Sequence, residues 1–524
     1  MLSKKPKLLR KIPGPVVLLI WDGFGLSKHI SGNAEASAHM PVWHEFLSNY
    51  SKSELRSDGE AVGLPKFECG NSEVGHATIG AGRAVPSDTI LINQAIKDKS
   101  FFDNTALLRA AAHVIEHGSA LHLMGLLTNR QSGHAAFNHI AALIKFAERL
   151  KLPKVVLHLF TDGRDTEPFH ALKLLGELED ILPENFKIGS VSGRFYSMDR
   201  DRNWGRTGLV YSVLTRGEGV VADSAAQAIE QGYARGESDE FLMPTSILQP
   251  DGKALVIDDH DAVIFWNLRT DRARQLTKPF VQHDFELKEK RPFRRSRKVR
   301  DLCFVTMTEF GKQINGDGAA IPAFPHHEIS GTLVEALRTH KQIYISESEK
   351  YAQVTYFMDG GYDAPRFGEE RVRIPSQKVS SFDRAPNMRA KEISKAVVSA
   401  VNKGHDFVCA NFANADMVAH TGNFKAAVLA CEALDRSLLL IWKAIKKKRG
   451  ALMITADHGN VEEMASAHGA IDTHHNPNPV PFVCASSKVH KQSVRKGTLA
   501  DIAPTVLSFL GVDKPKEMKG HSLI

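Results

Sequence analysis

Residues 69–83 read CGNSEVGHATIGAGR, a glycine-studded stretch that contains one serine, Ser72. Glycines at positions 70, 75, 80 and 82 predict a tight loop that approaches a ligand closely, which suits a phosphate group. The residues after Ser72 can open a helix, which would place the hydroxyl near free backbone N–H groups. An isolated hydroxyl is a poor nucleophile without a base or a metal ion. Taken alone, the stretch slightly favours an ordinary glycine-rich turn.

Length and composition limit the number of domains and the kinds of partner that this protein can have. A chain of 524 residues exceeds what one core organises, so we expect two to four domains. Its 43% apolar and 24% charged residues are normal for a globular protein. The five cysteines are scattered and never spaced C-x-x-C, which argues against disulfides and zinc knuckles and favours a reducing cytoplasm. The net charge of +7 favours anionic partners, either a phosphorylated metabolite or nucleic acid.

The amino-terminal region combines a basic segment, residues 1–10, with the apolar run 16–21. This run is too short for a signal peptide, and Asp22 follows it instead of a cleavage site. We therefore expect a basic tail that leads into a buried strand. No other stretch approaches the ~18 apolar residues of a membrane helix, so no membrane partner is expected.

Short apolar runs followed by polar clusters recur along the chain, at residues 16–21, 155–160, 262–266, 407–410 and 451–455. They predict buried parallel strands, and ligands collect beyond the carboxyl ends of such strands. Helical patterns fall between them at residues 391–403 and 424–449, the second with Gly450 expected at its C′ position. The alternation predicts an α/β fold.

Several carboxylate and imidazole pairs are candidate metal ligands. Asp416 and His420 are four residues apart, Asp457 and His458 are adjacent, and His474 and His475 follow shortly after. This donor set suits Mn²⁺, Zn²⁺ or a similar ion. With 24 histidines in the chain, each pair alone is weak evidence. If Asp22 and Ser72 join them, a metal ion would lower the pKa of Ser72 and hold it for attack.

Arginines gather beside the predicted ligand loops in the middle of the chain, at positions 164, 194, 200, 269 and 272. A guanidinium group binds carboxylate or phosphate through two parallel bonds, so together they suggest a domain that binds a small dianion. Singly, each is more typical of a weak surface ion pair. The basic segment 291–300 contains one aromatic residue, which favours a solvated surface loop over a nucleic-acid patch.

Eight motifs together resemble the cofactor-independent phosphoglycerate mutases of the alkaline phosphatase superfamily. They span nearly the whole chain, at residues 22–25 (DGFG), 70–76 (GNSEVGH), 161–166 (TDGRDT), 198–201 (MDRD), 349–352 (EKYA), 416–420 (DMVAH), 455–460 (TADHGN) and 478–482 (NPVPF). The resemblance implies a two-domain α/β fold. Residues 1–86 and 328–524 would form an alkaline-phosphatase-like phosphatase domain, and residues 87–327 an inserted substrate-binding domain.

The resemblance also implies a site and a reaction. One Mn²⁺ would be held by Asp416, His420 and His475, and a second by Asp22, Ser72, Asp457 and His458, with Zn²⁺, Co²⁺ or Mg²⁺ as alternatives. Ser72 would become phosphoserine while 3-phosphoglycerate and 2-phosphoglycerate interconvert without 2,3-bisphosphoglycerate. The catalytic residues would be Ser72, Lys350, Asp165 and Arg272. Substrate would be bound by His134, Arg164, Asp165, Arg194, Arg200, Arg269, Arg272 and Lys350.

The implied protein is a cytoplasmic monomer of glycolysis or gluconeogenesis that binds no nucleic acid. Two departures from the family pattern stand out: residues 128–134 (TNRQSGH) form a segment one residue longer than usual, and Thr270 replaces a common proline. A related metal-dependent phosphatase or phosphopentomutase is the first alternative. The second is a nucleic-acid binder that uses the basic segment 291–300.

Overall fold

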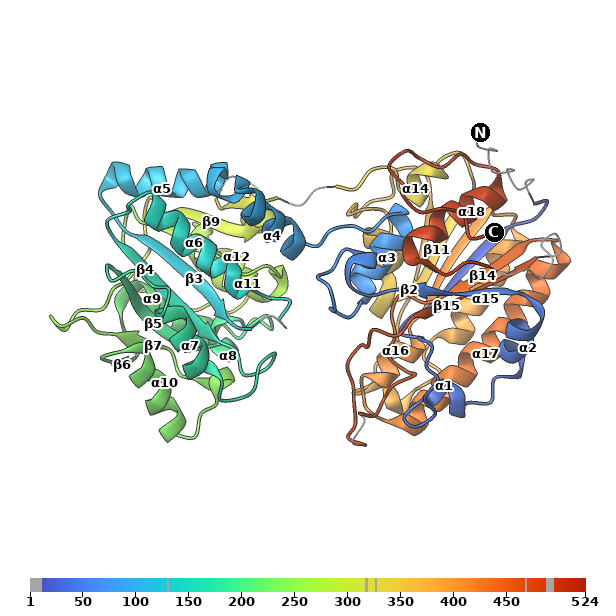
Figure 1. Cartoon of the computed structure of the whole chain (residues 1–524), viewed down its shortest axis with the longest axis horizontal. Helices are drawn as coiled ribbons and strands as arrows, with labels where there is room; N and C mark the ends of the chain where they lie inside the picture. Colours follow the sequence, from blue (N-terminus) through green and yellow to red (C-terminus); the bar gives the residue numbers. More distant parts are fainter. Residues whose placement is uncertain (1–11, 130–131, 316–318, 326–327, 467–468, 487–493) are drawn as a thin grey trace. The chain divides into compact units, whose positions relative to one another are not determined.

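The chain divides into two compact units in a computed structural model that describes residues 12–129, 132–315, 319–325, 328–466, 469–486 and 494–524. The first unit comprises Met1–Ser87 and His327–Ile524, so it contains both ends of the chain (blue and yellow to red in Figure 1). The second unit is the continuous stretch Asp88–His326. The basic tail predicted for residues 1–10 lies outside the described residues.

A mixed sheet forms the centre of the first unit. Within the described residues it has eight strands in the order β12-β11-β13-β1-β14-β15-β2-β16. They are β1 (Val16–Trp21), β2 (Ser51–Arg56), β11 (Gln342–Glu347), β12 (Glu370–Ile374), β13 (Phe407–Phe412), β14 (Ala451–Thr455), β15 (Val480–Ser486) and β16 (Gly497–Thr498). Strand β1 lies parallel to both β13 and β14, and Ile20 is aligned with Asn411 and Thr455. Every residue of β1 is buried, so both faces of the sheet are covered.

Helices α15 (Ala390–Asn402) and α17 (Phe424–Lys447) pack together and contact β13 and β14 respectively. Helix α18 (Ile502–Leu510) contacts β1 and packs with α3 (Ser72–Ala81) and α14 (Leu333–Ala336). The expectation for Gly450 is wrong, because Arg449 adopts the left-handed conformation instead (φ +56°). Gly450 is needed for space, since a Cβ there would lie 2.4 Å from the Pro15 carbonyl oxygen.

The second unit is built on a sheet with the order β10-β9-β8-β3-β4-β5-β7-β6, eight strands within the described residues. They are β3 (Leu121–Leu127), β4 (Val155–Thr161), β5 (Phe186–Gly193), β6 (Val220–Ala222), β7 (Thr245–Ile247), β8 (Ala262–Phe265), β9 (Cys303–Thr308) and β10 (Ile321–Phe324). Strands β3, β4, β5, β8 and β9 are mutually parallel, so their carboxyl ends meet at one edge. The two sheets with their helices confirm the predicted α/β fold class.

The longer helices of this unit are α4 (Asp88–Asp98), α5 (Thr105–His117), α6 (Phe137–Arg149), α7 (Ala171–Glu179), α9 (Trp204–Arg216), α10 (Ala225–Ala234) and α11 (Thr270–Val281). The remaining helices of the two units are α1 (Ala34–Ser37), α2 (Pro41–Asn49), α8 (Arg194–Ser197), α12 (Phe285–Lys288), α13 (Lys312–Asn315) and α16 (Asn414–Ala419). Short 3-10 and π turns complete them, of which η4 (Ser348–Lys350) and η5 (Gln353–Phe357) lie next to the region described below.

The glycine-studded stretch is mostly helix, which corrects the predicted loop. Asn71 caps α3, its side chain accepting hydrogen bonds from the N–H groups of Glu73 and Val74. A Cβ at Gly75 would lie 2.7 Å from the Asp457 carbonyl oxygen, and one at Gly80 would lie 2.0 Å from that of Met358. Of the four glycines only Gly82 has a left-handed φ, +59°. The glycines inside α3 therefore serve close packing.

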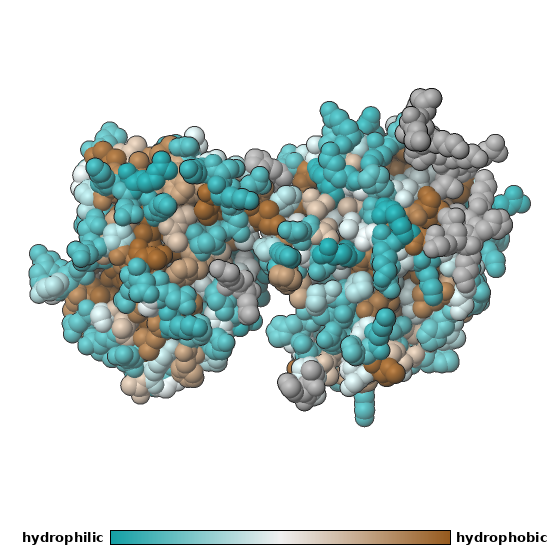
Figure 2. All heavy atoms as spheres, in the orientation of Figure 1, coloured by the Kyte–Doolittle hydropathy of each residue, from teal (hydrophilic) through white to brown (hydrophobic). Residues whose placement is uncertain are grey.

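The visible surface of each unit is mostly hydrophilic, with scattered apolar patches (Figure 2). None of the described helices is long and apolar enough to cross a membrane. All five cysteines are free. The basic segment 291–300 is an irregular loop, but Arg295 departs from the predicted solvated surface. Its side chain is 3% exposed and donates to Glu286 and to the carbonyl oxygens of Pro279, Gln282 and His283.

We expect Gly80→Ala to destabilise the first unit by about 1 to 3 kcal/mol, because the added methyl group overlaps the Met358 carbonyl. Gly176→Ala in α7 is the matched control, since nothing lies within 4 Å of its Cβ position. There the better helix propensity of alanine should stabilise by about 0.5 to 1 kcal/mol. Urea unfolding followed by circular dichroism compares the two. Equal changes in the free energy of unfolding of the two variants would show that the close approach of α3 to Met358 does not affect stability.

Candidate functional site

A polar cluster lies beyond the carboxyl ends of four strands of the first unit. Asp22 follows β1, Lys350 follows β11 in η4, Asp416 lies in α16 after β13, and Asp457 with His458 follows β14. Because β1, β11, β13 and β14 are parallel, their ends meet at one edge of the sheet. The topology therefore gathers residues that are hundreds of positions apart in the sequence.

Ser72 is the first residue of α3 and lies inside this cluster. Its Oγ lies 3.1 Å from Asp22 Oδ1, 3.0 Å from His458 Nε2 and 2.6 Å from Lys350 Nζ. The side chain is nearly buried, and the positive end of the helix dipole stabilises negative charge on its oxygen. The hydroxyl thus has a cation, a carboxylate and an imidazole within hydrogen-bond distance.

Lys350 joins the carboxylates of the cluster. Its Nζ lies 2.6 Å from Asp22 Oδ1 and 2.6 Å from Asp416 Oδ2. Burial alone would lower the pKa of Lys350, but Asp22, Asp416 and Asp457 outweigh it and raise the pKa above its ordinary value. Burial alone would likewise raise the pKa of Asp22, but Lys350 and His458 hold it low. One ammonium group therefore faces three buried carboxylates, which leaves an excess of negative charge.

Two histidines turn their Nε2 atoms toward Asp416. Nδ1 of His420 donates to the Thr473 carbonyl at 2.7 Å, and Nδ1 of His475 donates to the Gly70 carbonyl at 3.0 Å. Their Nε2 atoms lie 3.1 Å apart, and 3.1 and 3.3 Å from Asp416 Oδ1. When both rings are neutral, three acceptor atoms face one another, and a metal ion can satisfy all three. His474 points elsewhere and its side chain is 89% exposed.

The second group of potential ligands consists of Asp22, Asp457 and His458, next to Ser72. His458 Nε2 lies 3.6 Å from Asp22 Oδ1 and 3.5 Å from Asp457 Oδ2. Burial alone would lower the pKa of His458, but Asp457 and Asp22 raise it to about 9. Asp457 Oδ2 is buried and accepts no hydrogen bond within the described residues. A negative potential and an unpaired buried oxygen fit a divalent cation, and carboxylates with imidazoles suit Mn²⁺ or Zn²⁺.

Three neighbours of these groups were not among the predicted site residues. Asn411 Nδ2 donates to Asp22 Oδ2 at 2.7 Å, and Asn460 Nδ2 donates to Asp416 Oδ1 at 2.8 Å. His76 Nδ1 lies 3.2 Å from Asp457 Oδ2. The two asparagines each orient one carboxylate, whereas His76 Nδ1 donates to the Ser72 carbonyl at 2.9 Å. Asn411, the next-to-last residue of β13, and Asn460 belong to polar clusters that follow apolar runs in the sequence, so that pattern could have identified them.

The predicted substrate residues lie at the carboxyl edge of the sheet in the second unit. His134 follows β3, Arg164 and Asp165 follow β4, Arg194 follows β5, and Arg269 with Arg272 follows β8. Arg194 is 2% exposed and contacts Asp165 at 3.0 Å as well as Asp162, which the sequence analysis did not select. Ser132 Oγ, in the lengthened segment, donates to Asp165 at 2.7 Å. Residues 130 and 131 of that segment lie outside the described residues.

The positive charges of these groups shift one another's pKa values. Burial and the positive charges of Arg200, Arg194 and Arg164 lower the pKa of Arg272. Burial, Arg194 and Arg269 lower the pKa of His134 to about 4, so its ring is neutral at physiological pH. Arg200 is paired with Asp271 at 2.6 Å, whereas Arg164 is more than half exposed and only reaches Glu240 at 3.9 Å. The group is a cationic surface suited to a small anion.

Comparisons with known proteins identify the family. Residues 92–312 match the family model described as the BPG-independent PGAM N-terminus. The 2,3-bisphosphoglycerate-independent phosphoglycerate mutase of Moorella thermoacetica is 43% identical over 515 residues, which cover 97% of this chain and 98% of the relative. The chain belongs to the 2,3-bisphosphoglycerate-independent phosphoglycerate mutases.

Two further proteins are similar to this chain over nearly its whole length. The enzyme named 2,3-bisphosphoglycerate-independent phosphoglycerate mutase 2 of Methanosarcina acetivorans is 43% identical over 97% of both chains. A crystal structure of Leishmania mexicana phosphoglycerate mutase at low cobalt concentration matches with a TM-score of 0.74 and 28% identity, over 99% of this chain and 98% of that one. The family predicted from the motifs is confirmed, and the chain is an enzyme.

We expect His475→Asn to weaken Mn²⁺ binding by at least about 10-fold, because it removes one of the nitrogens that converge on Asp416. His474→Asn is the matched control, since the adjacent ring contacts only Asp472. Calorimetric titration of both variants with Mn²⁺ measures the difference. Equal affinities would exclude His475 as a ligand.

Proposed function

We propose that this mutase family member interconverts 3-phosphoglycerate and 2-phosphoglycerate through a phosphoserine on Ser72, as a cytoplasmic monomer in glycolysis or gluconeogenesis. The observation that carries the proposal is the position of the Ser72 hydroxyl, 2.6 Å from Lys350 Nζ and 3.1 Å from Asp22. The names of the relatives support the same substrate. The two units serve as phosphatase and substrate-binding domains in this proposal, with the phosphatase domain formed from both ends of the chain.

Two divalent cations are part of the proposed site. Asp416, His420 and His475 would hold one, and Asp22, Asp457, His458 and the Ser72 oxygen the other. Mn²⁺ suits these donors, with Zn²⁺, Co²⁺ or Mg²⁺ as alternatives. When bound, such ions lower the pKa of a coordinated hydroxyl and neutralise phosphoryl oxygens.

Ser72 carries out the first half of the reaction. Its Oγ forms a bond to phosphorus while the bond from phosphorus to the 3-oxygen of glycerate breaks, and the serine proton passes to the departing alkoxide. Lys350, already in contact with Ser72 Oγ, stabilises the negative charge on the phosphoryl oxygens in the transition state. The product of this half is phosphoserine and glycerate.

The second unit supplies the groups for the second half. Arg194, Arg200, Arg269 and Arg272, together with Arg164 and His134, bind the carboxylate of glycerate and keep it from leaving. Asp165 removes the proton of the 2-hydroxyl, whose oxygen then attacks phosphorus while the bond from phosphorus to Ser72 Oγ breaks. The serine oxygen takes up one proton from water, and Asp165 returns its proton to water, so both groups are regenerated. Burial raises the pKa of Asp165, but Arg194 and Ser132 outweigh it and keep the carboxylate ionised at neutral pH.

The decisive assay measures 2-phosphoglycerate formation from 3-phosphoglycerate without 2,3-bisphosphoglycerate. We expect activity that is lost on chelation and restored by Mn²⁺. Release of inorganic phosphate instead would favour a phosphatase, and activity only on pentose phosphates would favour a phosphopentomutase. Either result contradicts the proposed reaction.

Ser72→Ala should abolish both turnover and the acid-stable phosphoserine formed from ³²P-labelled 3-phosphoglycerate, because no other hydroxyl takes its place in the cluster described. Ser37→Ala, which removes an exposed hydroxyl on α1, is the control and should keep full activity. Full mutase activity in the Ser72 variant would exclude the covalent route.

Asp165→Asn should lower kcat by about 10²- to 10⁴-fold, the usual contribution of a general base. Phosphoserine should accumulate in this variant, since Ser72 still forms it but the 2-hydroxyl is not activated. Asp201→Asn changes an exposed neighbour on the same side of the second unit and should behave as the parent. Rapid acid quench with labelled substrate separates the two halves. Loss of phosphoserine formation in Asp165→Asn would assign Asp165 to the first half instead.

A further inference from the structure

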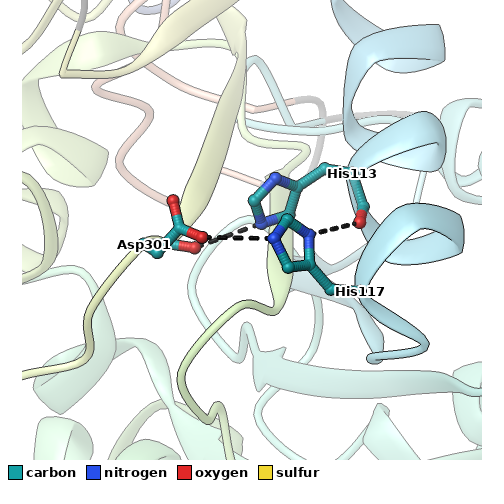
Figure 3. A group of neighbouring side chains, drawn as sticks. All are labelled: His113, His117 and Asp301. Atoms are coloured by element: carbon teal, nitrogen blue, oxygen red, sulfur yellow. Dashed lines mark hydrogen bonds and ion pairs between the residues drawn. The ribbon is translucent and has the colours of Figure 1, made fainter.

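Three histidines and one aspartate form a cluster that the proposed reaction does not use. His113 and His117 are one turn apart at the end of α5, and Asp301 precedes β9 (Figure 3). The His117 ring nitrogen Nε2 lies 3.4 Å from Asp301 Oδ2, and His260 Nδ1 lies 2.7 Å from the same oxygen. The potential ligand atoms of His113, His117 and Asp301 all lie within 4.8 Å of one another. We refer to these four residues as the histidine–aspartate cluster.

The tautomer of His117 is the first reason to assign a ligand to the cluster. Its Nδ1 donates to the His113 carbonyl at 2.9 Å, an acceptor that carries no proton (Figure 3). In a neutral ring Nε2 therefore carries the lone pair, and it lies 3.4 Å from Asp301 Oδ2. A proton on Nε2 or a metal ion can join these two atoms, and a backbone carbonyl on the other ring nitrogen is the usual support of a metal-binding histidine.

The surroundings of the histidine–aspartate cluster also favour positive charge. His117 is the last residue of α5, where the helix dipole stabilises a cation. His117 and His260 stack with ring centroids 4.9 Å apart, so the rings are already ordered. The hydrogen bond from His260 holds the pKa of Asp301 below its usual range. His260 and Asp301 both adopt left-handed backbone conformations, φ +67° and +49°, which are strained for residues other than glycine.

The cluster is separate from the proposed substrate residues. His260 and Asp301 precede β8 and β9, and α5 ends just before β3 begins, so the cluster lies at the amino edge of the sheet. Arg269 and Arg272 follow β8 at the carboxyl edge of the same parallel strands. The cluster and the arginines therefore occupy opposite edges of the second unit.

We propose that the histidine–aspartate cluster binds a transition-metal ion of the Zn²⁺ class, with His117, Asp301 and a ring nitrogen of His113 as ligands. Imidazole-rich sites of this kind select Zn²⁺, Ni²⁺ or Cu²⁺ over Mn²⁺ and Mg²⁺. Asp301 is 55% exposed, so water can complete the coordination. The ion would tie the end of α5 to the loops before β8 and β9.

The test counts Zn²⁺ bound to the full-length chain after equilibrium dialysis, by mass spectrometry of the metal. The parent should bind about one Zn²⁺ more per chain than His113→Asn/His117→Asn. Asp301→Asn should weaken that binding by at least about 10-fold, and asparagine tolerates the left-handed backbone, so folding is preserved. His39→Asn/His44→Asn, which removes two exposed histidines of the first unit, is the matched control and should bind as the parent does.

Equal Zn²⁺ counts for the parent and for His113→Asn/His117→Asn would overturn the proposal. So would an equal loss in the control variant, which would indicate loose binding to surface histidines. Mutase activity measured with Mn²⁺ should be unchanged in His113→Asn/His117→Asn. Because ions at Asp416 and Asp22 contribute equally to every variant, the difference in count stands even if the proposed reaction is wrong.

Discussion

The contact of the Lys350 ammonium with Asp22, Asp416 and Ser72 is the interaction on which the first unit's site depends. Carboxylates placed together in a buried position repel one another, and leaving them unpaired would cost several kcal/mol per charge. The fold tolerates them because one lysine, several imidazoles and the amides of Asn411 and Asn460 surround them. Even so, negative charge remains in excess. That excess makes the site selective for cations.

Parallel topology explains how such a cluster forms from distant segments. Asp22, Lys350, Asp416 and Asp457 each follow a different strand, and none needs a long loop to reach the others. Ser72 is the exception, because α3 delivers it from outside the sheet. The helix has to approach the end of β14 closely, and Gly75 permits this by leaving room for the Asp457 carbonyl. Glycine therefore positions the hydroxyl through helix packing, whereas the sequence suggested a phosphate-binding loop.

Strand ends and their polar residues could be predicted from the sequence because the signal is local: an apolar run followed by Asp, Asn, Arg or His. The family could be predicted because eight motifs occur in order. What could not be predicted depended on side-chain directions. His76 and Asn411 acquire their roles from partners hundreds of residues away, and Arg295 is buried by carbonyl groups that no pattern reveals. The cluster of His113, His117, His260 and Asp301 was missed for the same reason, since only the His113–His117 spacing is visible in the sequence.

The alignment of β1 with its neighbours gives the polar residues a part in folding. Each residue of β1 is apolar and buried. If the strand shifted by one residue, its side chains would still be buried, so hydrophobicity alone distinguishes poorly between the two registers. Such a slip would move Asp22 by about 3.3 Å, out of reach of Lys350 and Asn411. The polar groups of the proposed phosphate site therefore also help to fix the register of β1. A variant that lacks these carboxylates should therefore pair β1 in the wrong register more often, in addition to losing activity.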